Sequence, residues 1–265
     1  MFRHPIRSLF FFILIVGIGI FAYAERVGIQ EWVREQLKPE LPTAEDFSDQ
    51  LESIKEIVEN PAVLLDRETD AVELPSEKLL SVPFTSQAPH ANWDMPYQEA
   101  CEEASLLMVA GYYRGERGDY MPDAADRMIL DLVDFEEGMG LPMDITVAEA
   151  KKVVEAYYSD LQATVIPIED AEDIKLFLAK GIPVIVPADG KVLPNPNFQN
   201  GGPIYHMLVV IGYTDDGQFI TNDPGTRLGK SFLYEEQALI DAIHDWNGGD
   251  VPNGEKVGLI VTVES

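Results

Sequence analysis

The order of helical and strand patterns in this 265-residue chain predicts an α+β fold. Helix-forming patterns with capping residues dominate between positions 98 and 180. Short apolar runs separated by turn residues follow from position 182 onward, which is the pattern of an antiparallel sheet. We therefore expect N-terminal helices packed on an antiparallel sheet, with the single cysteine at the start of the first long helix.

The first 24 residues have the pattern of an export signal. Arg3 and Arg7 precede an apolar run over 9–21, and small residues follow in Ala22-Tyr23-Ala24. The run is short for a membrane-spanning helix, which needs about 20 apolar residues. We expect residues 1–24 to be either a cleaved signal peptide or an uncleaved membrane anchor. In both cases the rest of the chain is exported, either secreted or held at the membrane.

Residues 25–78 are acidic and are divided by prolines. Thr43 precedes two acids, as an N-cap would, and apolar residues then recur at helical spacing up to Asn60-Pro61. Two interpretations stay open for this segment: a stalk, or a pro-segment that lies across a catalytic cleft. The change of pattern at Leu79 predicts that a compact domain covers residues 79–265.

Within this domain each element has its own signal. The run over 79–87 predicts an extended segment, and the helix over 98–113 is expected to stop at Arg114-Gly115. A long loop over 188–203, rich in Asn, Pro and Gly, is either a lid or a surface insertion. The other elements are expected as helices at 123–133, 146–158, 171–180 and 235–243, and as strands at 182–187, 206–213, 218–221, 229–233 and 256–263.

Composition excludes several functional classes. The formal net charge of −27 argues against nucleic-acid binding, which needs clustered Lys and Arg. It favours basic or neutral substrates over acidic ones. One cysteine excludes an intramolecular disulfide framework. The motifs of zinc proteases, serine hydrolases and phosphate-binding loops are missing from the sequence, so we expect no metal or other cofactor.

Three residues distributed along the chain could form a nucleophile with its base and orienter. Cys101 lies at a predicted helix start, where the helix dipole lowers the pKa of a thiol. His206 opens an apolar strand, and a turn at Asp216-Gly217 would bring Asp223 back towards the imidazole. A thiol, an imidazole and a carboxylate are the parts of a cysteine catalytic triad. Each residue alone also fits a structural role in the core or in a turn.

The same chemistry needs hydrogen-bond donors for the oxyanion of a tetrahedral intermediate. The backbone N–H of Cys101 is one candidate, and a side-chain amide upstream is another. Gln87 and Gln98 both precede the cysteine, and Gln98 suits helix capping, so Gln87 is the expected donor. Trp93 lies in the spacer between Gln87 and the cysteine. It is a candidate substrate contact, with ordinary packing as the alternative.

Four segments together carry a family resemblance: Val82-Pro83-Phe84-Thr85-Ser86-Gln87, Cys101 at the head of a helix, the strand from His206 to Tyr213, and Thr221-Asn222-Asp223-Pro224. Over about residues 79–263 the chain resembles the bacteriocin-processing cysteine peptidases, which cleave double-glycine leader peptides and have a papain-like fold. The resemblance implies that Cys101 is the nucleophile and His206 the base. It also implies that Asp223 orients the base and that Gln87 is the oxyanion donor.

Two features depart from that family. Glu102 and Glu103 follow the cysteine, where the family usually has Gly. As like charges they oppose thiolate formation, and at a separation of about 8 Å the expected penalty is on the order of 1 kcal/mol. The spacer between Gln87 and Cys101 is also longer than in the family, and we expect a free-standing relative without a nucleotide-binding transporter module.

We therefore expect an exported, metal-independent cysteine peptidase that hydrolyses peptide or protein substrates through an acyl-enzyme at Cys101. Two alternatives stay open. One is a catalytically inactive exported binding module of the same fold. The other is an amidase or transpeptidase that uses the same thiol. The sequence does not define the oligomeric state.

Overall fold

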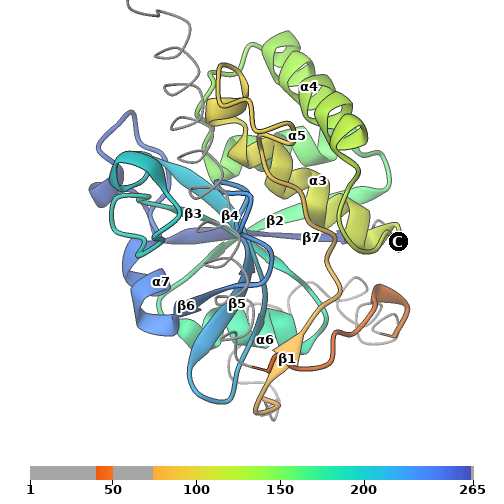
Figure 1. Ribbon diagram of the computed structural model, residues 1–265, viewed down its shortest axis with the longest axis vertical. Helices are drawn as coiled ribbons and strands as arrows, with labels where there is room; N and C mark the ends of the chain where they lie inside the picture. The colour runs from red at the N-terminus through yellow and green to blue at the C-terminus, as the bar shows by residue number, and fades with distance from the viewer. Residues whose placement is uncertain (1–39, 50–73, 264–265) are drawn as a thin grey trace, which may run out of the picture. The chain divides into compact units, whose positions relative to one another are not determined.

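The computed structural model describes residues 40–49 and 74–263, and most of the sheet follows the first three helices along the chain (Figure 1). The helices are α3 (Cys101–Tyr113), α4 (Pro122–Met139), α5 (Val147–Tyr157), α6 (Ala171–Ala179) and α7 (Glu236–Ala242), with 3-10 turns at Tyr97–Glu99, Gln199–Gly201 and Val251–Asn253. The strands are β1 (Lys78–Leu79), β2 (Leu161–Pro167), β3 (Val184–Ala188), β4 (His206–Tyr213), β5 (Gln218–Asn222), β6 (Phe232–Glu235) and β7 (Val257–Val263).

All pairs of named strands are antiparallel, and the order across the sheet is β2-β7-β3-β4-β5-β6. The short β1 pairs with the last residues of β4. Helices α3, α4 and α5 lie together in Figure 1, with α3 packed against β4 and α5 packed against β2 and β7. Helix α6 contacts β3 and β4, and α7 contacts β5 and β6. This is the α+β architecture that the sequence predicts.

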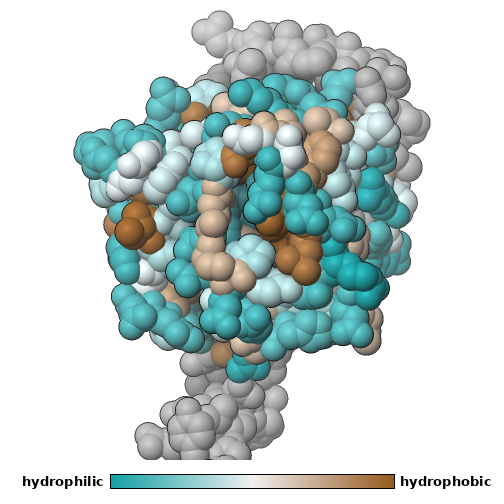
Figure 2. Space-filling model, turned by 90° about the horizontal axis from the view of Figure 1, so that it is seen from above, coloured by the Kyte–Doolittle hydropathy of each residue, from teal (hydrophilic) through white to brown (hydrophobic). Residues whose placement is uncertain are grey.

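The core centres on α3 and β4, in which every residue is buried. Because α3 is enclosed on all sides, it has no amphipathic stripe, and its sequence is apolar or small around its whole circumference after the first turn. The surface has the opposite character. The face seen in Figure 2 is largely hydrophilic, with separate apolar patches, as the strongly acidic composition leads one to expect.

Capping residues fix two helix starts close to the predicted positions. The hydroxyl of Thr146 accepts the backbone N–H of Glu149, whose carboxylate accepts the backbone N–H of Thr146 at the start of α5. Asp170 and Asp173 form the same reciprocal pair at the start of α6. These contacts satisfy N–H groups that have no acceptor within the helix.

Some elements within the domain differ from the sequence prediction. Helix α4 continues to Met139 and ends where Gly140 adopts a positive φ of 74°. The strand expected at 229–233 is β6, which starts later because the Asp223 N–H donates to the Gly229 carbonyl and holds the preceding residues in a turn. Strand β2 was not predicted, because its pairing partner β7 lies far along the chain.

In the N-terminal region, the segment over residues 42–49 is attached to the domain by main-chain pairing. Glu45 forms a parallel bridge with Leu80, and helical geometry begins only at Phe47. The helix start predicted at Thr43 is therefore wrong. The backbone of Glu45 pairs with the segment that continues from β1 instead of entering a helix.

Replacing Phe47 tests whether this segment contributes to the stability of the folded domain. The ring of Phe47 packs edge-on against Tyr112 and Tyr113 of α3, with centroid distances of 5.7 and 5.1 Å. We expect Phe47→Ala to lower the free energy of unfolding by about 2 kcal/mol, because a large, partly buried aromatic contact is lost. Urea denaturation measures this change. Ser48→Ala, at an exposed neighbouring position, is the control, and equal midpoints for Phe47→Ala and wild type would refute the prediction.

The predicted signal peptide or anchor, residues 1–24, lies outside the described residues, as does most of the 25–78 segment. Within residues 40–49 and 74–263, no helix has the length and apolar character needed to cross a membrane.

Candidate active site

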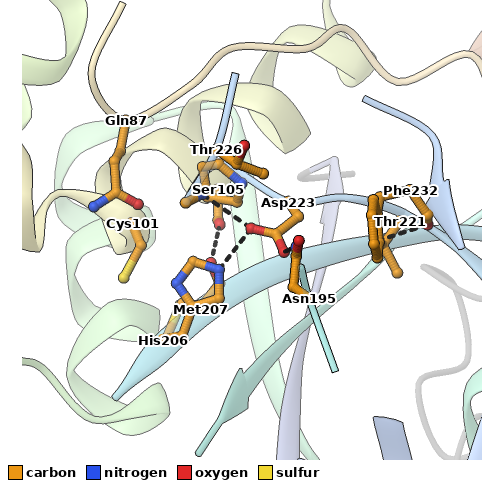
Figure 3. Close-up of polar contacts among 12 residues, drawn as sticks. Gln87, Cys101, Ser105, Asn195, His206, Met207, Thr221, Asp223, Thr226 and Phe232 are labelled. Atoms are coloured by element: carbon orange, nitrogen blue, oxygen red, sulfur yellow. Dashed lines mark hydrogen bonds and ion pairs between the residues drawn. The ribbon is translucent and has the colours of Figure 1, made fainter. Parts of the chain in front are cut away.

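Cys101 and His206 open two fully buried elements of the fold, since Cys101 is the first residue of α3 and His206 the first residue of β4. The two elements pack against each other, and one turn into α3 the hydroxyl of Ser105 donates to the Met207 carbonyl. Both residues are therefore held at the same end of the α3–β4 contact. Figure 3 shows Cys101 beside the imidazole of His206, with one ring nitrogen on the side of Cys101.

The imidazole of His206 is held by Asp223. Its Nε2 lies 2.8 Å from Oδ1 of Asp223, and both side chains are buried. A carboxylate only accepts, so Nε2 carries the hydrogen and Nδ1, on the side of Cys101 in Figure 3, is left as a proton acceptor. The hairpin predicted at Asp216-Gly217 creates this contact, because it pairs β4 with β5 and Asp223 follows directly after β5.

Asp223 is ionised although it is fully buried. Burial alone would raise the pKa of its carboxyl, but the charge of His206 and hydrogen bonds from His206, Tyr234 and the Gly225 backbone lower that pKa below its usual value. Oδ1 also accepts the Gly225 N–H at 2.9 Å, and Oδ2 accepts from Tyr234 at 2.6 Å and from Asn195 at 2.9 Å. These hydrogen bonds fix both the charge and the orientation of the carboxylate.

Two residues that sequence reasoning missed enclose the imidazole. The ring of Phe198 packs edge-on against His206, with 5.3 Å between centroids. Gly225 lies on another side, where an added Cβ would come within 2.8 Å of the His206 Cε1 atom, so only glycine leaves room for the ring. The only sequence signal for Phe198 was its place in the 188–203 loop. That loop borders the site directly.

Gln87 lies beside Cys101 in Figure 3. Its backbone N–H donates to the Pro224 carbonyl at 3.0 Å, which fastens it to the turn after β5. Its Nε2 donates to the carbonyls of Tyr97 at 3.0 Å and Gln98 at 2.9 Å, whereas Oε1 has no partner within the described residues. The amide nitrogen therefore has two acceptors, and an oxyanion would have to replace one of them to bind it.

The thiol of Cys101 contacts a carboxyl group. Sγ donates to Oε2 of Glu102 at 2.9 Å, and Glu102 is only 1% exposed. Burial, followed by the charge and hydrogen bond of Glu102, raises the pKa of the Cys101 thiol, while the Met207 backbone N–H lowers it. The expected separation of about 8 Å is therefore wrong, because the Glu102 side chain turns back onto the sulfur.

The Glu102 carboxyl belongs to a buried acidic group formed with Glu103 and Glu136. Burial, followed by the charge of Glu103, raises the pKa of Glu102 well above its usual value. Burial also raises the pKa of Glu103 to about 8 and, together with the charge of Glu103, that of Glu136 to about 9. In the part of the chain that the structure describes, none of the three pairs with Lys or Arg. Protonation is what relieves their repulsion.

Cys101, His206 and Gln87 line one cleft of about 720 Å³, which is the size of a small-molecule or side-chain binding pocket. Trp93, the candidate substrate contact, lines the same cleft. The further lining residues include aromatic side chains and charges of both signs: Phe198, Tyr205, Trp246, Glu99, Asp144, Lys191 and Arg227. Among residues 40–49 and 74–263, no group of His, Cys, Asp and Glu side chains is arranged to hold a metal ion.

Comparisons with known proteins give one family match and several similar solved structures. The model of the Peptidase_C39 like family matches residues 79–246. No curated protein sequence matches the chain. A solved structure of a C39-like peptidase from Bacillus anthracis has 18% identity and a TM-score of 0.45, covering 71% of this chain and 98% of that one. A prointerpain A fragment from Prevotella intermedia has 13% identity and a TM-score of 0.41, with coverage of 83% and 84%.

Proposed function

This chain belongs to the Peptidase_C39 like family, with its papain-like fold, and on that premise we propose that it is a cysteine peptidase acting through Cys101, His206 and Asp223. One observation carries the proposal. The His206 imidazole is bound through Nε2 to an ionised Asp223, and its other nitrogen lies on the side of the Cys101 sulfur. This is the relation that a nucleophile, its base and an orienting group require.

In the proposed reaction the Cys101 proton passes from Sγ to Nδ1 of His206, and the thiolate attacks the carbonyl carbon of the scissile peptide bond. The backbone N–H of Cys101 has no acceptor within α3, because it stands at the first position of the helix. It donates to the oxyanion, together with Nε2 of Gln87 once that amide releases one of its carbonyl acceptors.

His206 then donates its proton to the leaving amine, which breaks the C–N bond and leaves an acyl-enzyme on Sγ. Water attacks the thioester with His206 as base, and the carboxylic acid product leaves as the thiol is restored. Asp223 stabilises the imidazolium in both halves of the reaction. The cleft wall carries charges of both signs, so the preference for neutral or basic substrates rests on the net charge of −27.

The sequence pattern of residues 1–24 supports the further proposal that the enzyme acts outside the cytoplasm, either secreted or held at the membrane. Peptides or proteins are the substrates, and nucleic acid is not a partner, because the chain carries a net charge of −27.

A peptidyl epoxide inhibitor tests the proposal directly. We expect the folded wild-type protein to form one covalent adduct on Cys101, its only cysteine, because an activated thiolate in a peptide-binding cleft opens the epoxide ring. Intact-mass measurement and peptide mapping detect the adduct. His206→Asn is expected to slow its formation, since the base is lost. An inactive binding module would react only after denaturation, and that outcome would reject the proposal.

A further inference from the structure

The second oxygen of the Asp223 carboxylate has its own pair of donors. Oδ2 accepts from the Tyr234 hydroxyl at 2.6 Å and from Nδ2 of Asn195 at 2.9 Å. Nδ2 of Asn195 also donates to the Tyr234 oxygen at 2.9 Å, so the three side chains form a closed triangle. Their exposed fractions are 0% for Asp223, 1% for Tyr234 and 7% for Asn195. Solvent therefore does not compete for these hydrogen bonds.

The two donors come from different parts of the fold. Asn195 lies in the 188–203 loop that precedes β4, and Tyr234 lies in β6, which pairs with β5. Oδ1 of Asn195 accepts the backbone N–H of Asn197 at 3.0 Å, which fixes the amide so that Nδ2 points at the carboxylate. Figure 3 shows Asn195 beside Asp223. The same loop supplies Phe198, which packs against the His206 ring.

A buried carboxylate without enough donors takes up a proton. The titratable groups that face Asp223 are His206 from β4 and Tyr234 from β6. If Asp223 became protonated, it would lose the charge that stabilises the imidazolium and the acceptor that fixes the Nε2–H tautomer of His206. Neither Asn195 nor Tyr234 lines the cleft, so their influence on a substrate passes through Asp223.

From this geometry we propose that Asn195 and Tyr234 are positioning residues that keep Asp223 ionised and aligned with His206. Their effect on catalysis rests on the proposed peptidase function. The 188–203 loop is accordingly a fixed part of the catalytic support, because its Asn195 amide completes the environment of the orienting carboxylate.

The test is an NMR titration of the Asp223 carboxyl carbon in the full chain, compared between wild type and Tyr234→Phe. Loss of one donor to the charged form is expected to move the ionisation midpoint upward by about one pH unit. Tyr112→Phe is the matched control. Tyr112 is equally buried and loses a hydrogen bond to the Gly181 carbonyl instead, so its variant should leave the midpoint in place.

Asn195→Ala provides a second variant if Tyr234→Phe does not fold, and it is expected to move the midpoint in the same direction. Unchanged midpoints in the folded variants would overturn the proposal. The titration needs no substrate, so it decides the role of these residues even if the chain hydrolyses no peptide. In a peptidase assay, both variants should lower kcat with little change in KM.

Discussion

Cys101→Ala is expected to lower kcat/KM for peptide hydrolysis by about 10⁵- to 10⁶-fold, because the acyl-enzyme cannot form without the sulfur. The side chain is 4% exposed and stands at the first position of α3, so alanine removes one atom and suits a helix. The folded structure should therefore persist while turnover disappears. Initial rates with a fluorogenic peptide, measured over a range of substrate concentrations, give the ratio.

A matched replacement separates loss of the nucleophile from general disturbance of the helix. Ser105→Ala removes a buried polar atom one turn further along α3, together with its hydrogen bond to the Met207 carbonyl. We expect it to retain activity within about tenfold of wild type, since its hydroxyl contributes one neutral hydrogen bond. If the Cys101→Ala variant folds normally and still hydrolyses peptides at the wild-type rate, Cys101 is not the nucleophile.

Fold elements marked by local chemistry could be predicted from the sequence. The Asp216-Gly217 turn predicts the β4–β5 hairpin, and Thr146 precedes the helix that it caps. Strand β2 could not be predicted in this way. Its seven residues form a strand because they pair with β7, which lies about a hundred positions further along the chain. The β-bridge of Glu45 likewise depends on a distant partner and overrides a local helix signal.

The same difference between local signals and distant contacts explains which residues of the candidate site could be predicted. Asp223 could be placed near His206 from the sequence because one hairpin joins them. The amide of Asn195 could not be placed, because a loop rich in Asn, Pro and Gly has no periodicity that fixes where its side chains point. Glu102 was placed wrongly, because adjacent side chains on an ideal helix diverge. In the structure its Oε1 accepts the Ile145 N–H at 3.4 Å, and Oε2 is thereby turned to the sulfur.

Glu102→Gln is expected to raise the rate at which iodoacetamide alkylates Cys101 by about tenfold or more at pH values where the wild-type Glu102 carboxyl is ionised. In the wild type Oε2 of Glu102 accepts the thiol proton at 2.9 Å, so once Glu102 is ionised a thiolate would face a carboxylate across that short distance. Glutamine keeps the size of the side chain, carries no charge and donates an N–H to the thiolate. The replacement therefore lowers the pKa of Cys101, which burial and Glu102 raise in the wild type.

The pH dependence of this difference identifies its cause. Burial and the charge of Glu103 raise the pKa of Glu102, so the wild-type carboxyl is neutral in acid and ionises as the pH rises. Alkylation rates of wild type and Glu102→Gln should accordingly converge at acidic pH and separate as Glu102 ionises. Glu103→Gln is the matched control and should change the rate far less, because the charge of Glu103 has the smallest effect on the Cys101 pKa among the groups that shift it. Parallel profiles for wild type and Glu102→Gln, or an equal gain in Glu103→Gln, would show that the contact between sulfur and carboxyl does not control the nucleophile.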